Sequence, residues 1–226
     1  MKFCTENRIA IKSNLLKYMF RNVYFINGTA YAGKSTMVKM LAEKYDGICC
    51  GENYHDIFMD AIDVENQPDL SYFQTMKDWQ EFVNRTPEEY ERWIEGCGEE
   101  ASDMEIVRLI QLAERGKKIF VDTNISTDKL REISDYHHVA IMLAPQSTSV
   151  ERFFERGDEE KQFIFEQIQK AENPEKTMQN YRECLARVNS KERYRAFETS
   201  GFFTLVRNDA RALEQTLEIL AEHFKL

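Results

Sequence analysis

Proline, glycine and long apolar runs are scarce in this sequence. Its 226 residues include 4 prolines and 9 glycines, and no repeat, low-complexity tract or proline-, glycine- and serine-rich linker divides them. No early stretch is apolar for the length of a signal peptide, and none approaches the roughly 20 apolar residues of a membrane span. We therefore expect one domain over residues 1–226, cytoplasmic and without a membrane partner.

Paired cysteines are also missing. The five cysteines form no C-x-x-C pair and no spacing suited to clamping a metal, which excludes a disulfide framework and a structural zinc motif. Unpaired thiols fit a reducing compartment. Cys49 and Cys50 fall within a short apolar run, and we expect both to be small core residues.

A basic excess is the third absence. The formal net charge is -9 at pH 7, so the chain has no global field that attracts nucleic acid, and we expect no nucleic-acid partner. Hydrophobic residues make up 42% of the chain and aromatic residues 12%, which is a globular composition. A chain of this length buries about 70% of its extended surface, enough for a core without disulfides.

Five short apolar runs indicate β-strands. The runs are mostly continuous rather than alternating, as expected for parallel strands covered on both faces. Helical patterns separate them, and this alternation predicts a three-layer α/β/α fold with a five-stranded parallel sheet. The predicted strands are residues 23–26, 47–50, 118–121, 139–143 and 202–206.

Two of the intervals between strands are longer than one helix requires. Residues 52–117 carry several helical patterns and both tryptophans, which predicts a helical insertion over one edge of the sheet. Residues 146–200 form a second long helical segment, rich in arginine. Helix starts are predicted at the capping residues Thr86, Ser102, Thr148, Asn173 and Asp209.

A strand, a glycine-rich loop and a helix follow one another near the N-terminus. The loop reads G-x-x-x-x-G-K-S, a Walker A phosphate loop in the context that this motif requires. Its glycines let N–H groups converge on phosphates, and the helix N-terminus adds partial positive charge. Lys34 can reach the β- and γ-phosphates, and the Ser35 hydroxyl can bind Mg²⁺. The predicted nucleotide-binding residues are Gly28, Thr29, Ala30, Tyr31, Ala32, Gly33, Lys34, Ser35 and Thr36.

A carboxylate ends the third predicted strand. Asp122 follows an apolar run, which is the Walker B pattern, in which the carboxylate holds Mg²⁺ directly or through water. Many strands end in aspartate as a turn residue, but the phosphate loop upstream favours the metal role. Ser35 and Asp122 are therefore the predicted Mg²⁺ ligands.

Residues 25–36 resemble the start of P-loop small-molecule kinases. This group includes nucleoside monophosphate kinases, shikimate and gluconate kinases, and chloramphenicol phosphotransferase, which is the most similar in the loop itself. The order of the later segments is also similar. The resemblance implies transfer of the γ-phosphoryl group from ATP to a small-molecule acceptor held by the 52–117 insertion. The preference for ATP over GTP rests on the resemblance alone, and no residue identifies the acceptor.

Kinases of this group place substrate-binding groups, and often an acid, after the second strand. Transfer to a hydroxyl needs a carboxylate that orients it and accepts its proton. Glu52 is the first candidate, ahead of Asp56 and His55, with a solvated loop acid as its alternative; whether Glu52, Asp56 or Asp122 acts as the base stays open. The Asp-x-Asp pattern of shikimate kinases is missing, which disfavours a shikimate-like acceptor.

Arginines follow the fourth strand, where the resembling kinases have a lid over the phosphates. Arg152 and Arg156 lie four residues apart on one helix face and are predicted to neutralise phosphate charge, with Arg182 and Arg187 as further candidates. A solvated, salt-bridged helix is the alternative for this segment. The resemblance also places Asn208, in the turn after the fifth strand, near the adenine.

The sequence leaves two alternatives open, one for the aromatic residues of the insertion and one for the function. The aromatic residues of the insertion can line an acceptor pocket or pack into a core, and their helical spacing favours the core. The second functional hypothesis is a nucleotide switch or slow NTPase acting on a macromolecular partner, although no Asn-Lys-x-Asp guanine motif occurs. The oligomeric state is not predicted. The aromatic residues are Trp79, Phe82, Tyr90 and Trp93.

Overall fold

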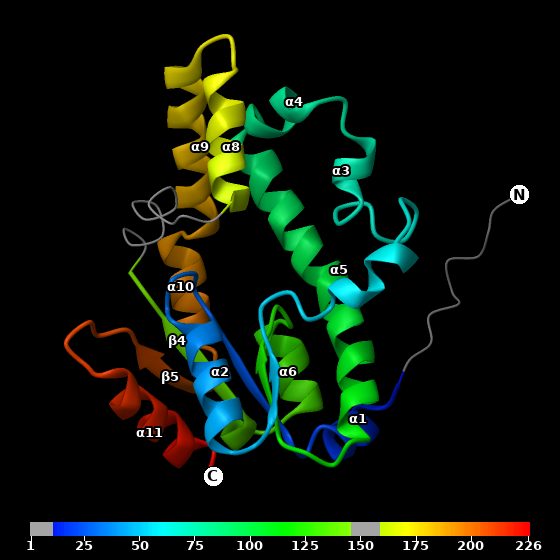
Figure 1. The fold of residues 1–226 in the computed structure, drawn as a ribbon, viewed down its shortest axis with the longest axis vertical. Coiled ribbons are helices and arrows are strands. Elements are labelled where there is room, and N and C mark those ends of the chain that lie inside the picture. Colours follow the sequence, from blue (N-terminus) through cyan, green and yellow to red (C-terminus); the bar gives the residue numbers. More distant parts are fainter. Residues whose placement is uncertain (1–10, 146–158) are drawn as a thin grey trace, which may run out of the picture.

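A five-stranded sheet runs through the lower half of the protein as drawn in Figure 1. The computed structural model describes residues 11–145 and 159–226, and within them all strands pair in parallel in the order β2-β3-β1-β4-β5. The predicted parallel sheet is therefore confirmed, with strand ends that differ by one or two residues. The strands are β1 (Val23–Gly28), β2 (Ile48–Cys50), β3 (Ile119–Asp122), β4 (Val139–Leu143) and β5 (Phe203–Val206).

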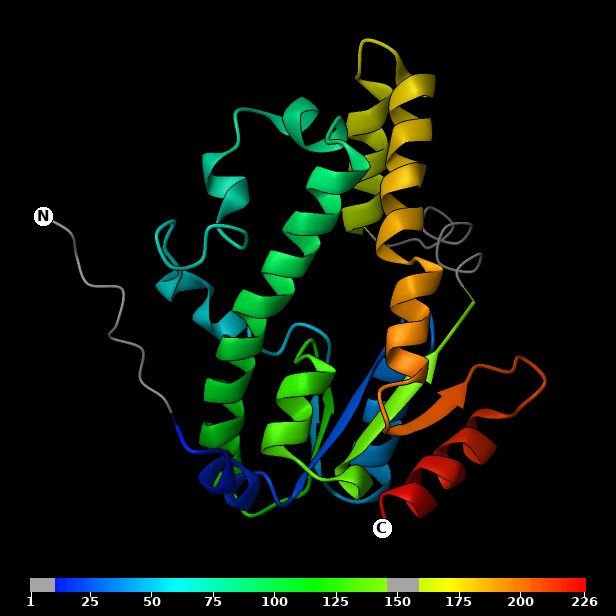
Figure 2. The same ribbon diagram turned by 180° about the vertical axis from the view of Figure 1, so that it is seen from behind.

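Helices cover both faces of the sheet, which is compatible with three layers (Figures 1 and 2). On one face α2 and α11 pack against Tyr24 and Ile26 of β1, and on the other α1, α5, α6 and α10 pack against Val23 and Phe25. Successive strand residues point to opposite faces, so a strand covered twice is apolar throughout. The helices are α1 (Ser13–Met19), α2 (Lys34–Lys44), α3 (Tyr72–Thr75), α4 (Trp79–Val83), α5 (Pro87–Ala113), α6 (Thr127–Ile133), α8 (Glu159–Gln169), α9 (Pro174–Val188), α10 (Lys191–Glu198) and α11 (Leu213–His223), with 3-10 helices at Asp56–Ala61 and Tyr136–His138.

The edge strand β2 buries only one of its two cysteines. Cys50 belongs to the core under α5, whereas Cys49 is exposed. Neighbouring residues of a strand face opposite sides, and an edge strand is covered less completely than a central one. The expectation that both cysteines are core residues is therefore wrong for Cys49.

A second group of helices stands beyond the carboxyl ends of the strands and is built around aromatic side chains. In Figures 1 and 2, α8 and α9 lie side by side next to α4 and the first half of α5. Phe82, Tyr90 and Tyr181 are buried in their shared core, and Trp79 and Trp93 pack against it. Core packing therefore describes Trp79, Phe82 and Trp93, whereas Tyr90 both packs in this core and borders a large cleft.

The 27-residue helix α5 joins this helical group to the sheet. Leu109 and Leu112 in its second half belong to a sheet core, whereas Tyr90 near its start belongs to the aromatic core. The helix continues through Ser102, which is buried in its interior, so the helix start predicted there is wrong. Packing at both ends holds the helix together across this point, which local capping chemistry does not reveal.

The other predicted helix starts have mixed outcomes. Thr86 forms a capping box with Glu89, and the Asn173 side chain accepts the Lys176 N–H at 3.1 Å, so both predictions are confirmed. Asp209 is not the cap of α11, because α11 begins at Leu213 after the N-cap residue Ala212, and the Asp209 carboxylate accepts from Arg207 Nε at 2.7 Å. The Thr148 region lies outside the described residues.

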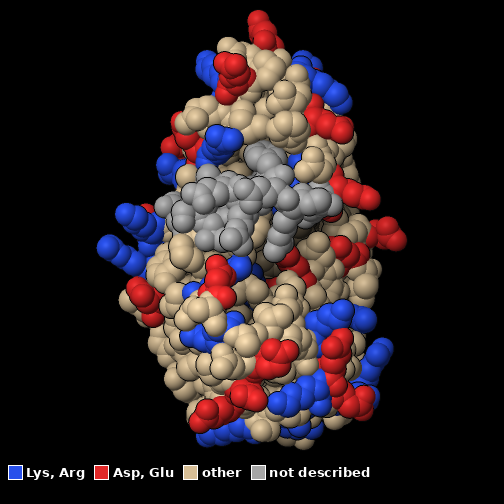
Figure 3. All heavy atoms as spheres, turned by 60° about the vertical axis from the view of Figure 1, so that its left-hand side comes forward, with Lys and Arg blue, Asp and Glu red and all other residues tan. Residues whose placement is uncertain are grey.

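The surface carries both charges. On the face shown in Figure 3, basic and acidic side chains are intermixed rather than gathered into one field. Within residues 11–145 and 159–226, no helix combines the length and apolar character needed to cross a membrane.

The chain segments that follow β1 and its neighbour β3 lie on opposite faces of the sheet. The chain after β1 enters α2 on one face, whereas the chain after β3 enters α6 on the other, and α10 lies against β4 on that face. In open parallel sheets, a crevice for ligands forms at the carboxyl ends of strands where the connections diverge in this way. The residues that follow β1 and β3 occupy this position.

Candidate active site

The loop of residues 28–36 begins with a glycine that no other residue can replace without displacement of the backbone. Gly28 has φ of 130°, and a Cβ atom there would lie 1.9 Å from the Met142 carbonyl oxygen of the neighbouring strand β4. Thr29 then donates its N–H to the same Met142 oxygen at 3.0 Å, and its hydroxyl accepts the Ala144 N–H at 2.7 Å. Gly33, with φ of 91°, turns the chain into α2.

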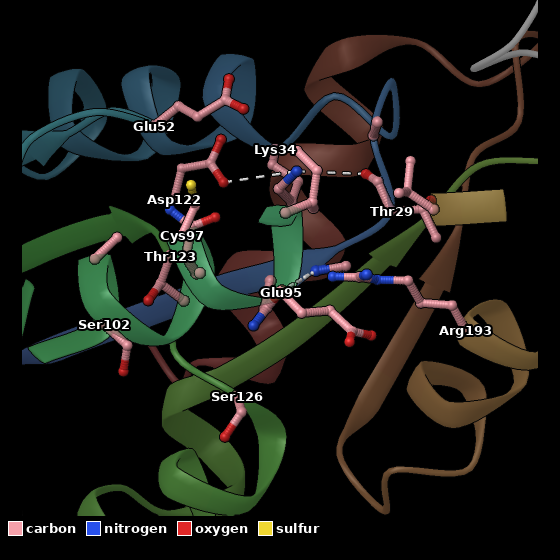
Figure 4. A pocket seen from close by; sticks show the side chains of 18 of the residues that line it. Thr29, Lys34, Glu52, Glu95, Cys97, Ser102, Asp122, Thr123, Ser126 and Arg193 are labelled. Carbon is pink, nitrogen blue, oxygen red and sulfur yellow. Dashed lines mark hydrogen bonds and ion pairs between the residues drawn. The ribbon is translucent and has the colours of Figure 1, made fainter. Parts of the chain in front are cut away.

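Lys34, Ser35 and Asp122 form a compact polar group at the end of this loop. The Ser35 hydroxyl donates to Asp122 Oδ2 at 2.7 Å, and Lys34 Nζ lies 3.7 Å from Asp122 Oδ1 and donates to the Thr29 carbonyl at 3.3 Å (Figure 4). The three residues meet because β1 and β3 are adjacent, with Ile26 opposite Asp122 in the register. Burial raises the pKa of Asp122, and the charge of Lys34 opposes that shift.

A large cleft opens in front of this group, with a volume of about 1790 Å³. One side, the loop wall, consists of the 28–36 loop with Asp122. The other side, the helical wall, consists of the cleft-facing residues of α5, α9 and α10. Every residue of the 28–36 loop lines the cleft except Ala32, which is buried beneath it. The structure therefore brings the predicted nucleotide-binding loop and Asp122 together at one opening.

The segment after β2 reaches the same cleft, but only some of its candidate acids do. Glu52 is exposed and lines the cleft beside Asp122, whose pKa its negative charge helps to raise (Figure 4). Asp56 is exposed and does not line the cleft, although its Oδ1 lies 3.8 Å from His55 Nε2. His55 is buried, and burial lowers the pKa of its imidazole, so the neutral ring is favoured. Glu52, His55 and Asp122 therefore line the cleft and Asp56 does not, and which group acts as the base stays a prediction.

Of the four arginines considered for the lid, only the further candidates Arg182 and Arg187 belong to the described residues, and neither lines the cleft. Arg152 and Arg156 lie outside those residues. Arg182 is exposed and does not line the cleft. Arg187 donates to Glu91 at 2.5 Å and to Glu88 at 2.8 Å, which ties α9 to α5. The salt-bridged alternative therefore describes Arg187, because the facing helix supplies two carboxylates.

Among the described residues, three cations besides Lys34 line the cleft and were missed at the sequence level: Lys129 of α6, which pairs with Asp103 at 3.0 Å, Lys161 of α8 and Arg193 of α10. In Figure 4 the Arg193 side chain of α10 extends into the cleft toward Glu95 of α5, and Lys161 of α8 places its Nζ 5.8 Å from the ring centre of Tyr31. Arg193 and Lys161 both lie within the predicted 146–200 segment, but nothing in their local sequence distinguishes them from its other arginines and lysines. Their position depends on how α8 and α10 pack.

Asn208 is not a cleft residue. Its side-chain oxygen accepts the Ala210 N–H at 3.0 Å and so stabilises the turn after β5. The same turn nevertheless borders the loop wall, because Arg207 Nη1 donates to the Tyr31 carbonyl at 2.5 Å. A role for Asn208 near the adenine stays a prediction.

A buried carboxylate, Glu105 of α5, was also missed. It is fully buried and accepts hydrogen bonds from the Thr123 hydroxyl at 2.6 Å and from the Tyr54 hydroxyl at 3.1 Å. The backbone N–H and the side-chain amide of Asn124 donate to it as well, at 3.1 and 2.9 Å. Burial raises the pKa of Glu105, and these donors oppose the shift. A single glutamate in a helical pattern carries no signal that predicts this cluster.

The oxygen atoms of Ser35 and Asp122 fit a magnesium ion better than a metal that prefers nitrogen or sulfur. Mg²⁺ takes oxygen ligands and is commonly held by one or two protein carboxylates together with substrate phosphates. Within residues 11–145 and 159–226, no cluster of three or more histidine, cysteine, aspartate or glutamate residues could hold a metal by itself. This pattern is compatible with an ion whose remaining ligands come from a nucleotide.

Comparisons with known proteins add no family to these observations. A scan against protein-family models, a search of curated proteins and a search of solved structures each found no match to this chain. The sequence motif and the geometry of the cleft are therefore the observations that bear on its function.

Proposed function

We propose that the protein is a phosphotransferase of the P-loop kind, which moves the γ-phosphoryl group of ATP to a small-molecule acceptor. One observation carries the proposal: Lys34 and Ser35, in the first turn of α2, both contact Asp122 from the neighbouring strand, at the mouth of a cleft of about 1790 Å³. This is the arrangement that the Walker A and Walker B patterns require of one another.

The loop wall supplies groups suited to a triphosphate. The first N–H groups of α2 have no intrahelical acceptor and point from a positive helix end toward the loop. Lys34 adds a full positive charge that can reach the outer phosphates. Mg²⁺ bound by Ser35 and Asp122 would neutralise further phosphate charge and orient the γ-phosphoryl group.

The helical wall supplies room for an acceptor. Gly98 of α5 lines the cleft, and a Cβ atom there would meet no heavy atom within 4 Å. Glu52, between the two walls, would orient the acceptor hydroxyl and take its proton. The acceptor oxygen then bonds to the γ-phosphorus while the bond from that phosphorus to the β,γ-bridging oxygen breaks, and ADP leaves. Arg193 and Lys161 would neutralise charge on the transferred group.

The test begins with binding of ATP and Mg²⁺ measured by calorimetry, followed by ADP release with a panel of hydroxyl- and phosphate-bearing metabolites. Lys34→Ala is expected to lower turnover by at least about a hundredfold and to leave the fold intact. Lys39→Ala is the matched control, because Lys39 lies in the same helix and pairs with Glu43 on the surface, at 4.0 Å.

Three results separate the hypotheses. ADP release that depends on an acceptor supports the phosphotransferase. Slow hydrolysis that no acceptor stimulates would replace it with a nucleotide switch or NTPase. Absence of ATP binding, or full activity in Lys34→Ala, would overturn the proposal.

A further inference from the structure

Glu105 of α5 bonds to the two segments that carry Glu52 and Asp122. Tyr54, two residues after Glu52, donates its hydroxyl to Glu105 Oε2 at 3.1 Å. Thr123 and Asn124, directly after Asp122, donate to the same carboxylate through a hydroxyl, a backbone N–H and a side-chain amide. One side chain therefore connects the β2 end, the β3 end and the helical wall.

The position of this carboxylate is unfavourable unless its hydrogen bonds are made. A buried charge that loses its partners destabilises a protein strongly, whereas an apolar residue of similar size would fill the same space without that risk. Glu105 is fully buried and has four donor groups from three residues around it. Such a network holds its members in one arrangement, because any displacement leaves a buried polar group unsatisfied.

The same network leaves Glu52 itself free to reach the cleft. Glu52 is exposed, and the short turns that follow it place the Tyr54 N–H on the Gly51 carbonyl at 3.2 Å and the Asp56 N–H on the Asn53 carbonyl at 3.0 Å. These local bonds shape the segment but do not attach it to the rest of the protein. The Tyr54 hydroxyl supplies an attachment, and it acts two residues from the proposed base.

We propose that Glu105 is a positioning residue that sets Glu52 and Asp122 at a fixed separation, and that it acts on Glu52 through the Tyr54 hydroxyl. The roles of Glu52 and Asp122 in this inference rest on the proposed function. Glu105 belongs to α5, which also forms part of the helical wall. Glu52, Asp122 and the acceptor space are therefore all positioned relative to the same helix.

Amide hydrogen exchange tests the attachment without any assumption about activity. In Tyr54→Phe, which removes only the hydroxyl, exchange at Tyr54 and Asp56 positions is expected to rise about tenfold or more, with exchange at Asn124 unchanged. In Thr123→Val the pattern is expected to reverse. Glu105→Ala should raise exchange in both segments, and Glu105→Gln should restore most protection, because its amide can still bond to both hydroxyls.

Tyr72→Phe is the matched control. Tyr72 also donates its hydroxyl to a glutamate of the insertion, Glu81, at 3.0 Å, but neither residue lines the cleft. This variant is expected to change neither segment. The inference would be overturned if Tyr54→Phe changed exchange equally at positions 54, 56 and 124, or changed it at none of them. Tyr54→Phe removes only a hydroxyl, so this test does not require that Glu105→Ala folds.

Kinetics of ATP hydrolysis, with water as the acceptor, test the link to Glu52. Tyr54→Phe is expected to lower kcat about tenfold with the KM for ATP and Mg²⁺ unchanged, because the loop wall keeps its own contacts. In a Glu52→Gln background, the same change is expected to have no further effect. If the kcat losses of Tyr54→Phe and Glu52→Gln instead multiply in the double variant, Tyr54 does not act through Glu52, and the inference is overturned. If the unaltered protein neither binds nor hydrolyses ATP, the proposed function fails, while hydrogen exchange still decides whether Glu105 holds the two segments.

Discussion

The two walls of the cleft are specified in different ways. The loop wall is built from nine consecutive residues and one aspartate on the adjacent strand, and its shape depends on short-range backbone geometry such as φ of 130° at Gly28. The helical wall is built from α5, α9 and α10, whose residues are far apart in the sequence and meet only through packing. A site that depends on the backbone geometry of consecutive residues can be predicted from the sequence. A site that depends on how separate helices pack cannot.

Each wall contains a glycine whose replacement by alanine is expected to change stability, in opposite directions. Gly28→Ala is expected to lower the free energy of unfolding by several kcal/mol, roughly 3 to 5, because the added Cβ meets the Met142 backbone at 1.9 Å and φ is positive. Gly98→Ala is expected to raise it by about 0.5–1 kcal/mol, since helical glycine is disfavoured and the added methyl group enters open space. Urea denaturation measures both. Similar effects at the two positions would show that the walls are not specified differently.

Asp122→Asn separates stability from activity within the loop wall. Turnover is expected to fall about a thousandfold, because the carboxylate for Mg²⁺ is lost. Burial raises the pKa of Asp122 in the folded state above the value of 3.8 in the unfolded chain. The charged carboxylate therefore lowers the free energy of unfolding at pH values above 3.8. The neutral amide of asparagine removes this effect and can still accept a hydrogen bond from Ser35. The unfolding temperature at pH 7 should therefore be unchanged or higher, and stabilisation by ATP with Mg²⁺ should disappear. A variant that still gains thermal stability from ATP with Mg²⁺ would contradict the assignment.

Two arginines sharpen the comparison within the helical wall. Arg193→Ala is expected to lower turnover about a hundredfold, because Arg193 lines the cleft and can neutralise phosphate charge. Arg187→Ala is its matched control: it breaks two half-exposed ion pairs, so we expect a loss of about 1 kcal/mol or less in the free energy of unfolding and unaltered turnover. Steady-state kinetics and thermal unfolding distinguish the two. Equal loss of activity would show that Arg187 acts on the substrate after all.

The smallest expected effect concerns pH and His55. Burial lowers the pKa of His55 below 6.5 in the folded state, so the unfolded chain binds its proton more readily. Stability from this group is complete above pH 6.5 and is lost as the pH falls from there through the folded pKa. His55→Gln should flatten this part of the stability profile by up to about 1 kcal/mol. Denaturation at pH 7.5 and 5.5 measures the difference, and an equal slope in both proteins would exclude His55 as a contributor.

Much of the fold was predictable because its strands are continuous apolar runs. Each of the five runs forms a parallel strand, and the continuous apolar pattern suits best the three central strands, which are covered on both faces. The strand order was not predictable, because any order of parallel strands buries the same runs. The helix start proposed at Ser102 failed for a related reason: packing at both ends of α5 outweighs a local capping pattern.

The residues of the candidate site also fall into two groups, those that the sequence predicts and those that it does not. The 28–36 loop and Asp122 were found from spacing, since a strand end and a glycine-rich turn leave a pattern in consecutive residues. Arg193 and Glu105 were missed, and Arg187 was considered as a further candidate beside Arg152 and Arg156, because a charged residue on a helix looks the same in sequence whether it faces a cleft, a carboxylate or solvent. Which of these it faces depends on the neighbouring helix.

By itself, the sequence determined the parallel sheet, the position of the 28–36 loop between β1 and α2, and the placement of an aspartate at the end of a buried strand. These features follow from local backbone geometry and from the period of apolar residues, both of which are properties of neighbouring positions. Only the tertiary structure decided that Ser35 and Lys34 contact Asp122, that Glu105 joins the ends of β2 and β3, and that Arg193 rather than Arg187 lines the cleft. Those contacts join residues from separate elements, and the order of the strands and the packing of α5, α9 and α10 bring them together.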